Sequence, residues 1–474
     1  MSSPLEEVCA EVLKRVTPTA TEKKKVLSLA KRLVEKVQEG AEEKGVEAEV
    51  RVEGSVAKNT WLRDCPEIDV FMRVPTSMPR EAFGTVCLEI AKKATEGYRQ
   101  IERFAEHPYL EAVTGDNVWV NVVPCYRVKR GGWISATDRT PFHTDYVKPL
   151  LDEQKSREVR LLKRFMKGVG VYGAEIKVGG FSGYLCELLV LNYGSFVEVL
   201  RSAADWKEGT TIDYERHYER KDDAKKLFQE PLVMVDPVDK KRNVAAAVRK
   251  EKLYEFIAAS RAFLETPDQK FFYPPQTEAL KQTELINKIN SRGSVIVFIS
   301  FEACPAVPDV LWGQLYRSQR ALRKLIQRHD FTVLRDAVWS NEKNFNTFIF
   351  EVENRFLTNM KRHLGPPLRK REDCEKFLQK HAGAESKVSE PRVEGERWIV
   401  DKQRRYTDVV ELLKEKLRDG GANVGLAEYV SKAVSESLKV MVNDEALNLY
   451  SGSPEFAKFL TEYLEGKPRW LVCV

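Results

Sequence analysis

Apolar and polar positions over the first 140 residues predict helices and strands in alternation. Residues 26–41 repeat apolar side chains at helical spacing, with charges between them. Residues 46–52 alternate apolar and polar side chains, and segments 67–74 (EIDVFMRV) and 118–126 (VWVNVVPCY) are further strand-like runs. A helix over about 80–96 is predicted between the last two. This order indicates an α/β unit with a mixed sheet.

The rest of the chain predicts a helical middle and a second mixed part. Helices are expected over 157–168, where Gly168 and Gly170 suit the C-terminal cap, and over 185–203. Strand and helix signals mix from there to about residue 265. A strand at 294–301, a basic helix at 311–329 and strands at 331–339 and 347–352 follow in the order of a ferredoxin-like unit. The last hundred residues are charged and predicted to be mainly helical.

Composition bounds the class of protein. The chain has 474 residues and is 43% hydrophobic, enough for a sizeable core. Its net charge of +6 is compatible with an acidic partner but too small to identify one. No apolar run reaches 18 residues, so no membrane span is expected, and the first residues lack a signal-peptide layout. Eight scattered cysteines argue against disulfides or a zinc site and favour a reducing, cytoplasmic location.

A Gly-Ser pair, Gly54 and Ser55, stands where the first predicted strand ends and a short helix can begin. Glycine lets the backbone approach a ligand closely, and the N–H groups at a helix start favour negative charge. The serine hydroxyl adds another donor. The pattern is typical of a phosphate-binding turn, although Gly-Ser is also a common turn that binds nothing.

Two carboxylates, Glu67 and Asp69, follow on the next predicted strand. Side chains two residues apart project from the same face of a strand. The flanking Ile68, Val70 and Phe71 are core residue types, so this strand is predicted to lie inside the sheet. Neighbouring carboxylates there repel each other unless a cation lies between them, and they suit Mg²⁺ that also holds substrate phosphates. A surface strand with incidental acidic residues is the alternative.

Gly54-Ser55, a spacer and an acid–apolar–acid–apolar strand form the signature of polymerase-β-type nucleotidyltransferases. Within that superfamily the chain resembles the archaeal, class I CCA-adding enzymes, which are tRNA nucleotidyltransferases. The resemblance is dense over the first 250 residues and looser beyond. It rests on eight ordered blocks: GSVAKNTWL (54–62), EIDVFM (67–72), AEHPY (105–109), VNVVPCY (120–126), DRTPFH (138–143), EVRLLKRFMKGVGVYGAE (158–175), GFSGYLCELL (180–189) and VDPVDKKRNVAA (235–246).

The resemblance implies an α/β (α+β) fold in three parts. Residues 1–140 would form the nucleotidyltransferase catalytic head with its mixed sheet. Residues 141–265 would form a helical central or neck domain that takes part in base selection. Residues 266–474 would form a ferredoxin-like body and a mainly helical tail that bind tRNA.

The resemblance also implies a role for individual residues. Two Mg²⁺ ions would be bound by the acidic pair and by the third position of the family's metal triad: Glu67, Asp69 and Asn121. The triphosphate would be contacted by Ser55, Lys58, His143, Lys163 and Tyr172, with Gly54 beside them. Lys58 stands where the family usually has arginine and lacks its bidentate fork. Glu106 and His107 fall on a block near the terminal nucleotides.

Arg242 corresponds to the family's base-selecting arginine, whose planar guanidinium suits the acceptors of C and A. Four of these assignments have a plainer alternative in the residues themselves. Lys163 could be a solvated helix lysine, Tyr172 a core aromatic and His143 a structural cap. Arg242 could belong to a solvated basic run with its two preceding lysines.

Binding of tRNA is expected on basic residues interleaved with aromatics. One group lies along the predicted helix 311–329, with Tyr316 nearby: Arg317, Arg320, Arg323, Lys324 and Arg328. The second surrounds Pro366-Pro367: Lys361, Arg362, Arg369, Lys370 and Arg371. Phosphate contacts give salt-dependent affinity with little sequence information. The acceptor and TΨC arms would be recognised by shape, since A-form grooves hide base identity. Solvated faces are the alternative, and a homodimer is implied by family analogy.

The implied activity is addition of C, C and A to the tRNA 3′ end from CTP and ATP, without a nucleic-acid template and with release of pyrophosphate. Two alternatives stay open: a poly(A)-type polymerase, and a catalytically weak tRNA-binding or quality-control homologue.

Asn121 supports the last alternative, a catalytically weak homologue. In the family this strand supplies a third aspartate, whereas asparagine brings no charge and accepts no proton. Whether it is a natural divergence or a deliberate replacement, the chain is expected to bind its substrates and transfer nucleotides slowly.

Overall fold

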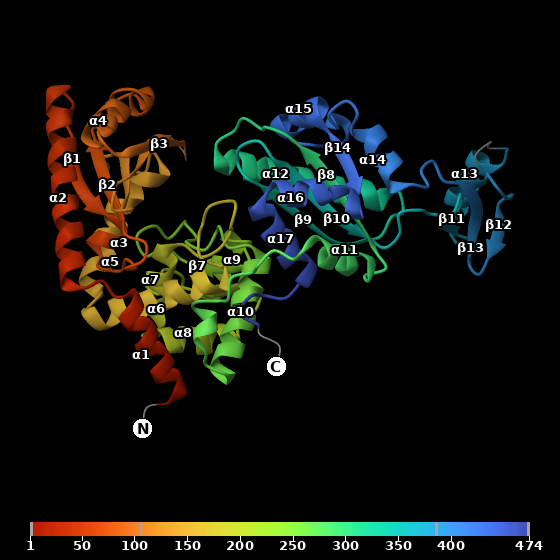
Figure 1. The fold of residues 1–474 in the computed structure, drawn as a ribbon. Helices are drawn as coiled ribbons and strands as arrows, with labels where there is room; N and C mark the ends of the chain where they lie inside the picture. The colour runs from red at the N-terminus through yellow and green to blue at the C-terminus, as the bar shows by residue number, and fades with distance from the viewer. Residues whose placement is uncertain (1–2, 105–106, 384–386, 472–474) are drawn as a thin grey trace. The chain divides into compact units, whose positions relative to one another are not determined.

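The computed structural model describes residues 3–104, 107–383 and 387–471. Contacts divide the chain into two compact units, Met1–Gln276 with Pro468–Val474, and Thr277–Lys467. Figure 1 shows a mixture of helices and sheets in each unit, so the protein has the predicted α/β (α+β) character. The finer division at residues 140 and 265 stays a prediction.

The first unit contains a five-stranded sheet in the order β1-β2-β5-β4-β3. Its strands are β1 Glu49–Glu53, β2 Glu67–Val74, β3 Arg99–Phe104, β4 Pro108–Val113 and β5 Trp119–Tyr126. Strand β2 pairs with β5 in parallel and the other pairs are antiparallel, so the mixed sheet is confirmed. Helices α2 Ala20–Glu43 and α4 Val86–Ala94 cover one face of it (Figure 1).

Alternation along β2 and β5 divides their side chains between the two faces of the sheet. Ile68, Val70, Val120 and Val122 pack beneath α2 and α4. The intervening residues, which include Asp69, therefore project from the other face. The helix predicted over 80–96 is instead a 3₁₀ segment, Arg80–Gly84, followed by α4. The helix is interrupted because Thr85 has a non-helical backbone conformation.

A second core in the first unit is mainly helical. Its elements are α1 Pro4–Val16, α5 Thr140–Val147, α6 Glu153–Val169, α7 Gly183–Tyr193, α8 Phe196–Ala204, α9 Lys221–Leu227 and α10 Lys250–Glu265, with the short parallel strands β6 Thr210–Ile212 and β7 Leu232–Met234. Phe165 is packed at its centre against Phe196, Phe263 and Phe272. Gly170 forms the C-cap of α6 at φ +86°, as predicted, whereas Gly168 lies inside the helix.

The long helix predicted over 185–203 is two helices, α7 and α8, that meet at 90°. Gly194 ends α7 with a positive φ of 92°, and the Ser195 side chain caps α8. In the part of the chain that the structure describes, no single helix is long and apolar enough to cross a membrane. This bent pair passes the same test only when the two helices are taken together.

The second unit is built on the four-stranded sheet β14-β8-β10-β9. Its strands are β8 Val295–Phe301, β9 Val333–Ser340, β10 Asn346–Val352 and β14 Lys439–Val442, and its helices are α11 Gln282–Asn290, α12 Pro308–Arg328, α14 Val409–Leu417, α15 Glu428–Ser437, α16 Leu447–Gly452 and α17 Pro454–Glu465. Val297 and Ile299 of β8 pack on the side of α12, α14 and α15, and Ile296 and Phe298 on the side of α11 and α17.

The last hundred residues are mainly helical, as predicted, but the C-terminal part of the chain also contains strands that were not predicted from the sequence. A three-stranded sheet, β11-β13-β12, is formed by β11 Met360–Pro367, β12 Arg392–Glu394 and β13 Arg397–Gln403, beside α13 Arg371–His381. These strands are short and rich in charge, so their alternation is hard to distinguish from a solvated helix. Their pairing, such as Leu364 with Ile399, comes from segments distant in sequence.

Candidate active site

The acidic pair and Asn121 lie side by side across the two parallel strands of the first sheet. The β2–β5 register places Asp69 opposite Asn121. The Asn121 amide donates from Nδ2 to Glu67 Oε1 at 2.7 Å and to Asp69 Oδ1 at 2.9 Å. Burial, and secondly the Glu67 charge, raise the pKa of the Asp69 carboxyl to about 7. A neutral amide thus bridges two carboxylates at the position where the resemblance implies a third acid.

Both the backbone conformation and the close packing at residue 54 require glycine. Its φ is +66°, a conformation that favours glycine, and a Cβ there would lie 1.9 Å from Asp69 Oδ2. The residue begins the short helix α3 Gly54–Ala57, which follows β1 directly. The Gly-Ser turn and the acidic strand are therefore in contact, as the combined signature requires.

A cavity of about 340 Å³ brings most of the predicted site residues together. Its lining includes Gly54, Ser55, Lys58, Glu67, Asp69, His143, Lys163, Tyr172 and Arg242. These side chains come from β2, α3, α5, α6 and loops, so the sheet and the helical core both contribute. Their grouping agrees with the predicted site, while their individual roles stay predictions.

Two predicted phosphate-binding lysines share one buried carboxylate. Lys58 and Lys163 are 7% and 2% exposed, and both pair with Glu187 of α7, which is 1% exposed. Thr60 donates from Oγ1 to Glu187 at 2.6 Å and accepts from Lys163 Nζ at 3.0 Å. Burial alone would raise the pKa of Glu187, but the two lysine charges outweigh it and lower the pKa. Burial lowers the pKa of Lys163.

A second buried carboxylate, Asp236, holds three other side chains of the cavity. His143 Nε2 and Arg242 Nη1 lie 3.0 and 2.8 Å from Asp236 Oδ2, and the Tyr184 hydroxyl donates to Oδ1 at 3.2 Å. Tyr184 stacks on the His143 ring at 4.1 Å between centroids. Burial lowers the pKa of His143, while Asp236 acts in the opposite direction; Nε2 is the donor in this bond, because an ionised carboxylate can only accept. Burial would raise the pKa of Asp236, but the His143 hydrogen bond and the Arg242 charge lower it to about 2.

The remaining predicted residues differ in their surroundings. Burial raises the pKa of Tyr172 well above its usual value, so its phenol stays protonated and can donate. His107 is 2% exposed, bonds Thr137 Oγ1 at 2.9 Å and meets Phe83 edge-on, and it is not among the cavity's lining residues. Glu106 lies outside the described residues.

Sequence reasoning missed Glu187, Asp236 and Tyr184. An acid inside the apolar run YLCELLVL was the available signal for Glu187, because a buried charge requires a partner. Asp236 lies in the same block as Arg242. Tyr184 carried no local signal, since an aromatic at a helix start is ordinary.

The donor set fits a divalent cation in part. Carboxylate and amide oxygens are the ligands that Mg²⁺ takes, and Glu67 and Asp69 converge on one place. Asn121 could offer a carbonyl oxygen there but adds no negative charge. Within residues 3–104, 107–383 and 387–471, no three His, Cys, Asp or Glu side chains are placed to hold one metal ion.

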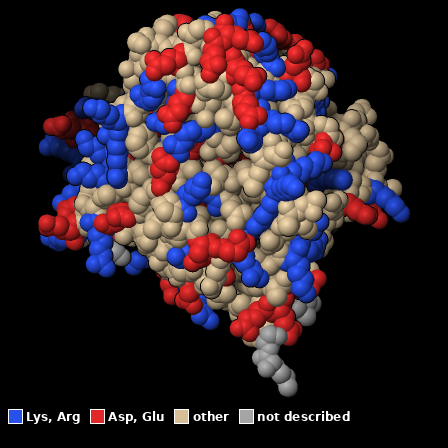
Figure 2. All heavy atoms as spheres, turned by 90° about the vertical axis from the view of Figure 1, so that its left-hand side faces the viewer, with Lys and Arg blue, Asp and Glu red and all other residues tan. Residues whose placement is uncertain are grey.

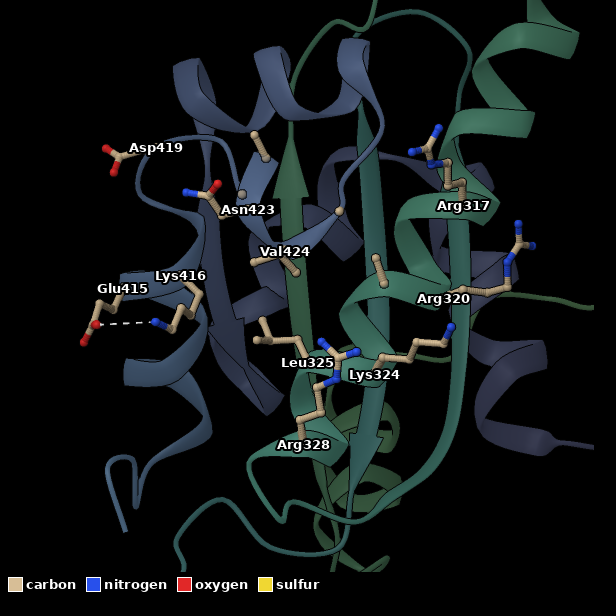
Figure 3. A pocket seen from close by; sticks show the side chains of 14 residues that line it. Arg317, Arg320, Lys324, Leu325, Arg328, Glu415, Lys416, Asp419, Asn423 and Val424 are labelled. Carbon is tan, nitrogen blue, oxygen red and sulfur yellow. Dashed lines mark ion pairs between the residues drawn. The ribbon is translucent and has the colours of Figure 1, made fainter. Parts of the chain in front are cut away.

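A separate cavity of about 650 Å³ in the second unit carries most of the first predicted basic group. Figure 3 shows Arg317, Arg320, Lys324 and Arg328 projecting from α12 on one side, with Glu415, Lys416 and the 419–424 loop on the other. Among the described residues these four α12 cations have no ion-pair partner. Arg323 belongs to the same predicted group but pairs with Asp336 of β9, so it is not part of this surface.

The second predicted basic group is mostly neutralised. Ion pairs join Lys361 to Asp330, Arg362 to Glu394, Lys370 to Asp373 and Arg371 to Glu375. On the face shown in Figure 2, cations and carboxylates are likewise interspersed. The α12 cavity therefore differs from the second basic group in how its charges are arranged, and not in the net charge of the chain.

Comparison with known proteins shows that two parts of the chain each match a protein family. "tRNA nucleotidyltransferase, second domain" matches residues 157–273, and "CCA-adding enzyme, C-terminal domain" matches residues 292–443. The CCA-adding enzyme of Methanosarcina barkeri is 38% identical over 441 residues, 92% of this chain and 94% of that protein. The CCA-adding enzyme of Methanosarcina acetivorans is 37% identical over 462 residues, 97% of this chain and 98% of that protein.

Among solved structures, the Cid1 poly(U) polymerase aligns with a TM-score of 0.45 and 17% identity. The alignment covers 57% of this chain and 98% of that one. A score this low supports no inference about this protein.

Proposed function

The chain belongs to the archaeal, class I family of CCA-adding enzymes, and from this premise we propose how its site performs the reaction. The protein adds C, C and A to the 3′ end of tRNA, using nucleotide substrates and a divalent metal. We propose that CTP and ATP are the nucleotide donors and that Mg²⁺ is the metal. In the reaction the tRNA 3′-hydroxyl would attack the α-phosphorus, with loss of pyrophosphate.

One observation carries this proposal: a single cavity joins the acidic pair of β2 to the cations of the helical core. Glu67 and Asp69 would hold Mg²⁺ together with the substrate phosphates. When bound, the metal would supply positive charge to the transferring phosphoryl group. Lys163 would offset triphosphate charge, and Tyr172 and Ser55 would offer hydroxyl donors. Lys58, Lys163 and Glu187 are almost fully buried, so water has little access to these three charges.

Base choice is assigned to Arg242, which lines the same cavity. A guanidinium presents several fixed donors in one plane, and cytosine and adenine both offer ring acceptors to such donors. Uracil presents an N–H at the corresponding ring position, so two hydrogen-bond donors, this N–H and an N–H of the guanidinium, would face each other.

The direct test supplies the chain with tRNA lacking CCA, labelled CTP and labelled ATP. Addition of C, C and A is expected, slowly because of Asn121. Long A tracts without C would refute the proposal in favour of a poly(A)-type polymerase. Binding of tRNA and CTP without transfer, even after Asn121→Asp, would favour the non-catalytic homologue.

We propose that the α12 cavity contacts the backbone of the acceptor and TΨC arms. Its exposed cations are spaced along one face of the helix and have no ion-pair partner among the residues that the structure describes, which leaves them available to phosphates (Figure 3). Recognition there is by shape, since phosphate contacts carry little sequence information.

The test for this surface is the salt dependence of tRNA affinity. Lys324→Ala should lower the slope of log affinity against log salt by about 0.7–1. Lys31→Ala is the matched control, because it removes one exposed cation of α2 that pairs with Glu35 at 3.8 Å. An equal slope for Lys324→Ala and the unchanged chain would exclude the α12 cavity from the interface.

A further inference from the structure

The Asp236 carboxylate connects three parts of the site that are distant in sequence. Arg242 belongs to the loop after β7, His143 to α5 and Tyr184 to α7. All three bond one carboxylate that is fully buried. This carboxylate therefore couples the position of Arg242 to both helices.

The loop from Asp236 to Arg242 is fixed along its backbone as well. The Asp236 N–H donates to the Arg242 carbonyl at 3.0 Å, and the Val238 N–H donates to Asp236 Oδ1 at 3.0 Å. The Arg242 N–H donates to the Asp239 carbonyl at 2.9 Å. The Arg242 side chain extends from this closed loop, and its bond to Asp236 Oδ2 restrains it.

Arg242 keeps part of its donor set open. Nη1 is bound to Asp236, and within the described residues Nε and Nη2 make no hydrogen bond. The side chain is 37% exposed. It lines both the catalytic cavity and an adjoining cavity of about 1,100 Å³. One end of the guanidinium is thus anchored, while the side chain also lines both cavities and keeps donors for a ligand.

We infer that Asp236 is a positioning residue for nucleotide choice, because it fixes the guanidinium of Arg242 through the same carboxylate that His143 and Tyr184 bond. This inference rests on the proposed function, in which Arg242 faces the incoming base. A fixed plane is what discriminates bases, because a guanidinium free to rotate can also satisfy the carbonyl oxygens of uracil.

The substitution Asp236→Asn separates this role from a merely structural one. Asparagine has nearly the same shape, and its Oδ1 can still accept from the Val238 N–H. Its Nδ2 would replace Oδ2 and face the donors of Arg242 and His143, since an amide nitrogen accepts no hydrogen bond. Arg242 should then turn away while the loop stays closed.

The experiment measures equilibrium binding of non-reactive α,β-methylene analogues of CTP and UTP to the full chain with tRNA lacking CCA. Asp236→Asn should reduce the CTP-over-UTP preference at least tenfold, with tRNA affinity unchanged. Asp239→Asn is the matched control: it lies in the same loop, its side chain bonds Arg139 at 2.9 Å, and the preference should stay intact.

A double substitution tests whether Asp236 acts through Arg242. Arg242→Ala should lose the preference, and Asp236→Asn added to it should cause no further loss. A preference kept in full by Asp236→Asn but lost in Arg242→Ala would overturn the inference and leave the proposed function standing. An unchanged chain that binds both analogues equally would refute the proposed base selection and the inference with it.

A milder variant covers the case in which Asp236→Asn does not fold. Tyr184→Phe removes only the hydroxyl that bonds Asp236 Oδ1 and keeps the ring on His143. The CTP-over-UTP preference should fall about threefold, with the thermal midpoint little changed. An unaltered preference in this folded variant would count against the positioning role.

Discussion

Replacing Asn121 by aspartate places a third carboxylate beside Glu67 and Asp69. The amide nitrogen lies 2.7 and 2.9 Å from their oxygens, so two hydrogen bonds become two close contacts between like charges. At about 3 Å and an effective dielectric constant of about 20, each charged pair repels by about 5 kcal/mol. Protonation of one carboxyl relieves much of this repulsion. Without metal, the free energy of unfolding should fall by about 3 kcal/mol.

A divalent cation should turn the destabilisation caused by Asn121→Asp into a stabilisation. Three carboxylates attract Mg²⁺ more strongly than two, so added Mg²⁺ should stabilise Asn121→Asp more than the chain as it stands. Denaturant unfolding with and without Mg²⁺ measures both effects. The variant should also transfer nucleotides about 10²–10⁴ times faster, if the restored charge stabilises the transition state by about 3–5 kcal/mol.

The rate assay follows single-turnover addition of labelled CTP to tRNA lacking CCA, at equal Mg²⁺ for each protein. Asn117→Asp is the matched control, because it adds a carboxylate in the exposed turn before β5, where φ is +59°. Equal rates for Asn121→Asp and the unchanged chain would show that the third carboxylate is dispensable and that the site assignment is wrong.

Three further changes test the surroundings of the site. Gly54→Ala should abolish nucleotide binding measured by calorimetry, because its Cβ would meet Asp69 Oδ2 at 1.9 Å; normal affinity would contradict the close approach. Glu187→Gln should lower the free energy of unfolding in urea by about 3–5 kcal/mol, because it leaves Lys163 buried without its counter-charge; a loss under about 1 kcal/mol would argue against that pair. Asp236 has a lowered pKa of about 2, so its contribution to stability is present above about pH 4 and is lost as the pH falls toward 2. Unfolding of Asp236→Asn should therefore depend less steeply on pH in that window, and identical slopes would contradict this assignment.

Local sequence determined the main elements that carry the site. Two-residue spacing placed Glu67 and Asp69 on one strand face, because side-chain direction in a strand alternates with every residue. The Gly54-Ser55 turn and the departure at Asn121 were also readable from the sequence. Each depends only on neighbours along the chain or on a block that matches the family.

Tertiary structure alone decided which side chains meet. Strand β2 pairs with β5 across some fifty residues, and this pairing sets Asn121 against Asp69. Glu187 and Asp236 acquire their partners only when α3, α5, α6, α7 and the loop after β7 pack together. Local periodicity can indicate that such carboxylates are buried but cannot specify the cations that compensate them.

The cations of α12 illustrate the same limit. Sequence treats Arg323 and Lys324 as neighbours in one basic run, yet Arg323 pairs with Asp336 while Lys324 lines the open cavity. Adjacent residues on a helix point about 100° apart, so which of them meets β9 depends on how the helix is rotated against the sheet. That rotation is fixed by the apolar face of α12 as it packs into the core, and so it follows from the folded structure and not from charge pattern.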